Sequence, residues 1–123
     1  MKILLTAFIL ITSILSFTPV VFAQKDLPAD DASTAAYVEL CKNTADEEAR
    51  SFCFGFGEGV YQAYLASRPP NAKPTICFTD KNDTRNEVLQ KFLSWNNTNP
   101  QFNKDKAAKT LMRFFTDHYS CKK

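Results

Sequence analysis

The stretch ADEEARSFCFGFGEGVYQAYLAS, residues 45–67, decides the fold. Small residues recur every four positions at Gly55, Gly59 and Ala63, so they fall on one face of a helix. Bulky apolar residues recur beside them with the same spacing, at Phe52, Phe56, Val60 and Tyr64. The spacing predicts one long helix that carries a smooth stripe next to an apolar ridge.

The glycines in this stretch make the helix costly on its own, because each costs about 1 kcal/mol relative to alanine in a helix interior. A second helix packed closely against Gly55, Gly59 and Ala63 would offset that cost. Two neighbours are open: the last helix of the same chain, or the same helix of a second copy. The stretch is therefore expected to be the central helix of an all-α bundle, with these three residues as its helix-packing surface.

Residues 1–23 have the pattern of a secretory signal peptide. Lys2 precedes an apolar run over residues 3–17, and the tripeptide at 21–23, which ends in Ala23, fits a cleavage site. The run is shorter than the roughly 20 residues that a membrane span needs, which favours a cleaved signal over an anchor. We expect a periplasmic or secreted protein with a flexible lead over residues 24–32 and one helical domain over residues 33–123.

The composition argues against some classes of partner. Lys and Arg number 15 against 13 Asp and Glu, a formal net charge of +2. Removal of Lys2 lowers the charge to +1, because residues 1–23 hold no other charged side chain. This near-neutral balance does not support binding to nucleic acid or to an anionic membrane surface. The 11 phenylalanines and only 3 glycines favour a packed helical bundle over a fold rich in loops.

All four cysteines, Cys41, Cys53, Cys77 and Cys121, follow the expected cleavage point. An even number in an exported chain indicates two disulfides, and the absence of a CxxC pair disfavours zinc. A tight turn between the first two helices would bring Cys41 near Cys53. Antiparallel third and fourth helices would bring Cys77 near Cys121. We therefore predict the pairs Cys41–Cys53 and Cys77–Cys121, with the other two connectivities as alternatives.

Start and stop signals predict a bundle of about four helices. The connection over residues 68–74 contains three prolines and cannot continue a helix, and residues 75–78 are expected to be extended and pinned by Cys77. The expected starts are Ser33 or Asp31 for the first helix, Thr44 in a capping box with Glu47 for the second, Thr84 in a capping box with Glu87 for the third, and Pro100 or Asn103 for the fourth.

Residues that could carry catalysis are few. His118 is the one histidine, no GxSxG motif is present, and the cysteines are expected to be oxidised. Asp80 and Asp83 are expected to cap the third helix rather than to act in acid–base chemistry. The glycine run 55–59 lacks the spacing of phosphate-binding loops, and Glu58 within it is expected on a solvated face or against a partner. We expect no enzyme, no metal site and no cofactor.

A family resemblance rests on the core from Cys53 to Val60, CFGFGEGV, within the four-cysteine frame. Around it lie a cysteine at the end of a short helix, a proline-containing loop before Ile76 and Cys77, an Asn-Pro break, and a final cysteine. This order resembles the Rap/Tai family of immunity proteins. The family commonly has Cys-x-Pro after the loop, where this chain has Thr79, and Pro-Cys at the end, where it has Ser120.

The resemblance implies a small, exported, disulfide-bonded helical protein that binds a peptidoglycan amidase effector delivered by type VI secretion and forms a homodimer. Loops on a rigid scaffold commonly carry recognition. We therefore expect the amidase to contact polar residues of the connection between the second and third helices. The alternatives are an acid-stress chaperone of the periplasm and a small secreted hydrolase that uses His118. The expected partner-contact residues are Arg68, Asn71, Lys73, Asp80 and Lys81.

Overall fold

The computed structural model describes residues 32–122, apart from the side chain of Asp80. The expected signal peptide over residues 1–23 and nearly all of the expected lead over 24–32 lie outside the described residues. Within them no β-strand occurs, which confirms the all-α prediction. The elements are α1 (Thr34–Cys41), α2 (Glu47–Ser67), the 3-10 turn η1 (Phe78–Asp80), α3 (Arg85–Asn97), the 3-10 turn η2 (Pro100–Phe102) and α4 (Ala107–His118).

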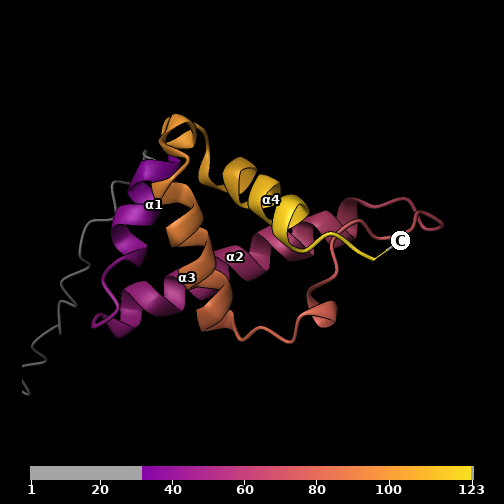
Figure 1. The fold of residues 1–123 in the computed structure, drawn as a ribbon, viewed down its shortest axis with the longest axis horizontal. Helices are drawn as coiled ribbons and strands as arrows, with labels where there is room; N and C mark the ends of the chain where they lie inside the picture. The colour runs from indigo at the N-terminus through magenta and orange to yellow at the C-terminus, as the bar shows by residue number, and fades with distance from the viewer. Residues whose placement is uncertain (1–31, 123) are drawn as a thin grey trace, which may run out of the picture.

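Helix α2 is the axis of the bundle. It has 21 residues and packs against each of the other three α-helices. In Figure 1, α1 and α3 lie over one half of α2 and α4 lies over the other half, and a loop projects beyond its carboxyl end. The prediction of one long central helix that ends near Ser67 is thus confirmed. None of the helices within residues 32–122 combines the length and the hydrophobicity that a membrane span requires.

Two of the expected helix starts are confirmed. The Ser33 hydroxyl accepts a hydrogen bond from the backbone N–H of Ala36 at 3.2 Å, which caps α1. Thr84 and Glu87 form the expected capping box at α3: Glu87 N donates to Thr84 Oγ1 at 3.2 Å, and Thr84 N donates to Glu87 Oε2 at 2.7 Å.

The predicted capping box at the start of α2 is wrong. Asp46 caps the helix instead of Thr44, because its carboxylate accepts from the backbone N–H groups of Glu48 and Ala49, both at 3.1 Å. One carboxylate oxygen thus satisfies two amides that the first turn leaves free. Thr44 lies in the turn that precedes the cap.

The predicted start of the fourth helix is also wrong. Pro100 begins the short turn η2, where a proline suits the first position, and Asn103 follows that turn. Lys106 is extended and forms an antiparallel bridge with Ser33, so α4 begins only at Ala107. The start of α1 and the start of α4 are therefore tied together by backbone hydrogen bonds.

Both predicted disulfides are confirmed. Cys41–Cys53 joins the end of α1 to the first half of α2, with a Cα–Cα distance of 5.9 Å. Cys77–Cys121 joins the segment before η1 to the segment after α4, with a Cα–Cα distance of 4.9 Å. The sequence separations are 12 and 44 residues, so loop closure alone stabilises the fold by about 3 and about 4 kcal/mol in the chain-entropy model.

The segment before η1 has a backbone partner. Ile76 and Ser120 form an isolated antiparallel bridge, Cys77 N donates to Tyr119 O at 2.7 Å, and Cys121 N donates to Thr75 O at 3.2 Å. The expectation of an extended segment at 75–78 holds up to Cys77, and Phe78 then begins η1. The second disulfide therefore reinforces a contact that hydrogen bonds already make.

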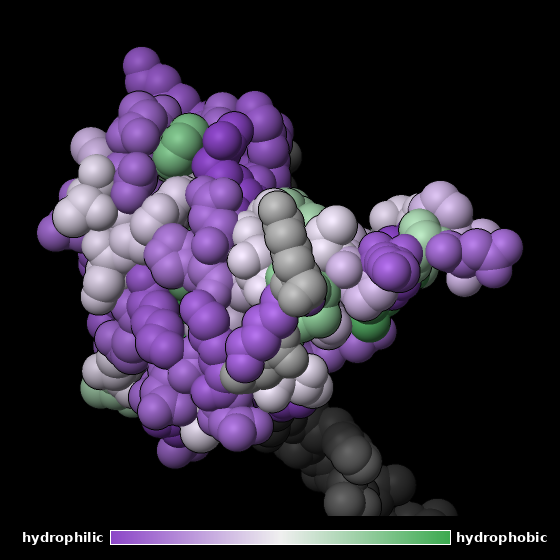
Figure 2. Space-filling view, turned by 45° about the vertical axis from the view of Figure 1, so that its right-hand side comes forward, coloured by the Kyte–Doolittle hydropathy of each residue, from purple (hydrophilic) through white to green (hydrophobic). Residues whose placement is uncertain are grey.

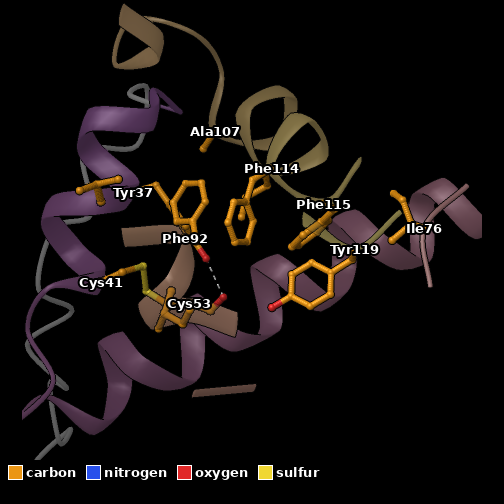
Figure 3. Packing of buried hydrophobic residues seen from close by; sticks show 12 residues of the cluster. Tyr37, Cys41, Cys53, Ile76, Phe92, Ala107, Phe114, Phe115 and Tyr119 are labelled. Carbon is orange, nitrogen blue, oxygen red and sulfur yellow. Dashed lines mark hydrogen bonds between the residues drawn. A yellow bond between two sulfur atoms is a disulfide. The ribbon is translucent and has the colours of Figure 1, made fainter. Parts of the chain in front are cut away.

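The core is aromatic and is drawn in Figure 3. Phe92 of α3 and Phe114 of α4 are fully buried and meet edge to face, with ring centroids 5.4 Å apart. Tyr37 of α1 packs its ring on Phe92 and donates its hydroxyl hydrogen to Cys53 O at 2.9 Å, the dashed line in Figure 3. Edge-to-face ring pairs stabilise by more than their buried area alone.

The stripe of small residues on α2 faces outward. Gly55, Gly59 and Ala63 are all exposed. Among residues 32–122, no atom outside the immediate helix lies within 4 Å of where a Cβ would stand at Gly55 or Gly59. Of the two neighbours that the sequence leaves open, α4 of the same chain is therefore not the one that covers this stripe. We call these three residues the outer stripe.

Candidate functional site

The five expected contact residues fall into two places. Arg68, Asn71 and Lys73 lie in the loop beyond α2, and Asp80 and Lys81 lie at the end of η1. Figure 1 shows this loop at the far end of α2 and η1 below the helix, so the five positions do not form one patch.

The loop beyond α2 is held by Tyr64, which the sequence placed on the apolar ridge without indicating this role. Its hydroxyl oxygen accepts from Thr75 N at 2.7 Å and Ile76 N at 3.3 Å and lies 3.0 Å from Thr75 Oγ1. Burial raises the pKa of Tyr64, but the hydrogen bonds from Thr75 and Ile76 outweigh it and lower the pKa overall. The Arg68 guanidinium lies 5.9 Å from the Tyr64 ring centroid and donates to Ala72 O. The Arg68 side chain therefore stabilises the loop through contacts within its own chain.

Lys81 also has a role within its own chain. Its ammonium donates to His118 O and lies 5.3 Å from the centroid of the Tyr119 ring, which fixes the end of η1 against the end of α4. Asn71 and Lys73 differ, because both are exposed and their side chains make no hydrogen bond or ion pair within residues 32–122. Of the four expected contact residues whose side chains the structure describes, these two are the most available to a partner.

A cavity of about 220 Å³ lies between α2, η1, α3 and α4, and we call it the inner cavity. Its walls are mostly apolar, and the acidic and basic groups among its lining residues are Glu58, Asp83 and Arg85. Glu58 and Arg85 are exposed. The apolar lining comprises Cys53, Phe54, Tyr61, Phe78, Val88, Leu89, Phe92, Leu111 and Phe115, completed by Tyr37 and Gly57.

On one side of the inner cavity, the Tyr37 hydroxyl lies next to Gly57, which has no side chain. The Tyr37 hydroxyl oxygen would lie 3.9 Å from a Cβ at Gly57, an ordinary van der Waals distance. Burial raises the pKa of the Tyr37 hydroxyl, so the group stays neutral. Gly57 therefore leaves open a space that a larger side chain would occupy.

A charged cluster borders the inner cavity at Asp83. Asp83 Oδ2 lies 2.5 Å from Lys91 Nζ and accepts from the Tyr119 hydroxyl at 2.8 Å. The hydrogen bonds from Lys91 and Tyr119 lower the pKa of Asp83, while burial and then the Asp83 carboxylate raise that of Tyr119. The expectation that Asp83 caps α3 is wrong, because Thr84 does so. Asp83 instead ties the start of α3 to the end of α4.

His118 is packed as a side chain of the bundle. Its ring stacks on Phe114 with centroids 4.4 Å apart, and its Nδ1 lies 3.2 Å from Phe114 O. All four cysteines are bonded in pairs, so no free thiol is at hand among the described residues. Over the same residues, no cluster of three or more His, Cys, Asp or Glu side chains could hold a metal ion.

The outer stripe has an aromatic neighbour on α2. Phe52 is 41% exposed, and its ring stacks on Phe56 with centroids 5.8 Å apart. Figure 2, which shows one face of the molecule, is mostly hydrophilic, with hydrophobic residues in small patches. Among residues 32–122, Phe52 is the one exposed large hydrophobic residue, so its position beside two exposed glycines is a distinct local surface.

A family model described as Rap1a immunity proteins matches residues 33–121. The match begins at the cap of α1 and ends at the final cysteine, so it spans every element described above. No curated protein matches the chain. No solved structure matches it either.

Proposed function

The chain belongs to the family of Rap1a immunity proteins, which neutralise effectors, and we propose that its own target is a secreted peptidoglycan amidase that it binds and inhibits in the periplasm. In this proposal the protein acts by occupying the effector, with no catalysis of its own. The family match over residues 33–121 is the observation that carries the proposal. The packed environment of His118 is consistent with a binding role.

The rigidity of the scaffold also supports binding. Two disulfides hold both ends of the domain, and Tyr64 holds the loop that carries Asn71 and Lys73. A surface that is already ordered loses little conformational entropy when a partner binds. We propose this loop as one contact for the amidase and the segment around Asp80 and Lys81 as a second, separate contact.

The test is rescue of cells from a co-expressed, exported amidase, together with capture of that amidase by the purified protein. A gene for such an amidase next to the gene for this chain would supply the candidate. We expect Lys73→Glu to weaken capture, while Lys104→Glu, an exposed lysine between η2 and α4, leaves it unchanged. Failure to protect against or capture any exported amidase would sink the proposal.

We also propose that the outer stripe forms a homodimer through close packing of α2 on α2 of a second copy. Gly55 and Gly59 have open space where a neighbouring helix would approach, and Phe52 lies exposed beside them. Leucine at Gly59 would keep the helix and block that approach. We expect Gly59→Leu to be a folded monomer by light scattering and circular dichroism. A wild-type chain that is monomeric at all concentrations would contradict the dimer.

A further inference from the structure

We propose that the inner cavity receives one aromatic side chain of the effector, and that tryptophan is the side chain it fits. The inference rests on the proposed function and names a specific anchor for that binding. It depends on four properties of the cavity: its volume, its aromatic walls, the hydroxyl at Tyr37 and the missing side chain at Gly57.

The volume suits a single aromatic group. An apolar cavity of about 150 Å³ is enough to hold benzene, so the 220 Å³ here can hold a larger ring system but not a peptide segment. The rings of Tyr61 and Phe78 in the wall already meet at 89° with centroids 4.9 Å apart. An aromatic guest can continue this edge-to-face arrangement, which is favoured over stacking face on face.

The hydroxyl of Tyr37 selects among aromatic guests. It uses its hydrogen on Cys53 O, at 2.9 Å, so the hydroxyl oxygen keeps the capacity to accept. An indole offers one N–H and no acceptor, and therefore complements this oxygen. A phenylalanine would fill space and leave the oxygen without a donor.

Gly57 provides the room, and it does so away from the outer stripe. Gly57 is two residues from both Gly55 and Gly59, which places it about 200° around the helix from each. An effector side chain in the cavity and a second copy on the outer stripe would thus approach α2 from opposite sides. At the rim, the exposed and oppositely charged Glu58 and Arg85 can meet polar groups that flank the inserted side chain.

The first experiment uses N-acetyltryptophanamide as the probe and follows its binding to the protein by NMR chemical shifts. We expect shifts confined to the cavity residues, and weaker binding of N-acetylphenylalaninamide. Gly57→Leu should fill the cavity and reduce tryptophanamide binding by at least about tenfold while the domain stays folded, whereas Gly57→Ala should retain binding. Tyr37→Phe should remove the preference for the indole. Absence of cavity shifts, or equal binding to Gly57→Leu, would overturn the proposal.

The second experiment measures the affinity of the neutralised amidase for wild type and for Gly57→Leu. Loss of one anchor in a binding hot spot weakens an interface by about 30-fold or more, and we expect at least that. If the amidase binds both proteins equally well, the anchor is disproved and the proposed function stands. If no exported amidase binds wild type, the proposed function fails and the effector side chain fails with it.

Discussion

Glycine occurs on both sides of α2, but it has a different role on each side. Gly57 faces the interior, next to Tyr37 and the inner cavity, whereas Gly55 and Gly59 face outward, with open space at their Cβ positions as far as the described residues go. A helix pays for all three, because glycine is unfavourable in its interior wherever it points. One glycine-rich run can therefore line a cavity within the protomer and also form an uncovered surface outside it.

The largest effect should come from removing an aromatic ring on the inner side. Phe92→Ala takes away a fully buried ring that lines the inner cavity and should lower the free energy of unfolding by about 3–5 kcal/mol. Phe52→Ala on the outer side is the matched control and should lower it by only about 1 kcal/mol in the monomer, because the ring is partly exposed and stacks on Phe56 alone. Denaturant unfolding of both variants measures the difference, and equal losses would mean that the two sides do not differ.

The disulfide that fixes the rotation of α2 should have the next largest effect. Joint replacement of Cys41 and Cys53 by alanine removes a bond that joins α2 to α1 and should cost about 3 kcal/mol by loop closure alone. Cys53 also lines the inner cavity, so the variant should expose cavity residues to hydrogen exchange. Unchanged exchange at Leu89 and Phe92 would show that the other contacts of α2 suffice to orient it.

Alanine at the outer glycines should have a smaller effect of the opposite sign. Gly55→Ala and Gly59→Ala each relieve a helix penalty of up to about 1 kcal/mol, and no described residue obstructs the added methyl group. The midpoint of thermal unfolding should therefore rise in dilute protein. A rise that reverses at high concentration would mean that a second copy packs too closely on this side to admit a methyl group.

The smallest expected effect is a loss of stability at acidic pH, which should depend on Asp83 beside the inner cavity and not on the outer side of α2. The lowered pKa of Asp83 means that its contribution to stability is present above the ordinary carboxyl range near pH 4 and is lost as the pH falls through its own lower pKa. Asp83→Asn should flatten this pH dependence, whereas Glu47→Gln, which breaks an exposed pair with Arg50 on α2, should not. An acid-stress chaperone would instead lose its structure and expose apolar surface below about pH 3, which dye binding would detect.

The sequence predicted the elements of this fold better than their orientation. The Thr84–Glu87 capping box and the end of α2 near Ser67 depend on local sequence signals, and both are confirmed. Both disulfides follow from the order and direction of the helices, and they are confirmed too. The sequence does not predict which face of α2 is buried, because apolar residues lie all around its first half. The buried residues of α2 are Ala49 and Cys53, which are four positions apart. Their row along the helix is shifted by one residue from the expected ridge, which begins at Phe52.

The features of the candidate site that the sequence missed depend on distant contacts. Nothing near Tyr64 in the sequence indicates that its hydroxyl accepts from the backbone of Thr75. The inner cavity likewise joins residues from α2, η1, α3 and α4. For Asp83, the neighbouring Thr84 takes the capping role, which leaves its carboxylate free for Lys91 and Tyr119.

The two backbone bridges have a consequence for the order of folding. Ser33 pairs with Lys106, and Ile76 pairs with Ser120, so each closure joins an early segment to one made much later. Contacts between residues far apart in the sequence form slowly and only after the intervening chain exists. A chain that has been synthesised only as far as α3 lacks both closures and the partner of Cys77. Native structure must therefore wait until synthesis has passed residue 121, when Cys77 gains its disulfide partner and both bridges can close.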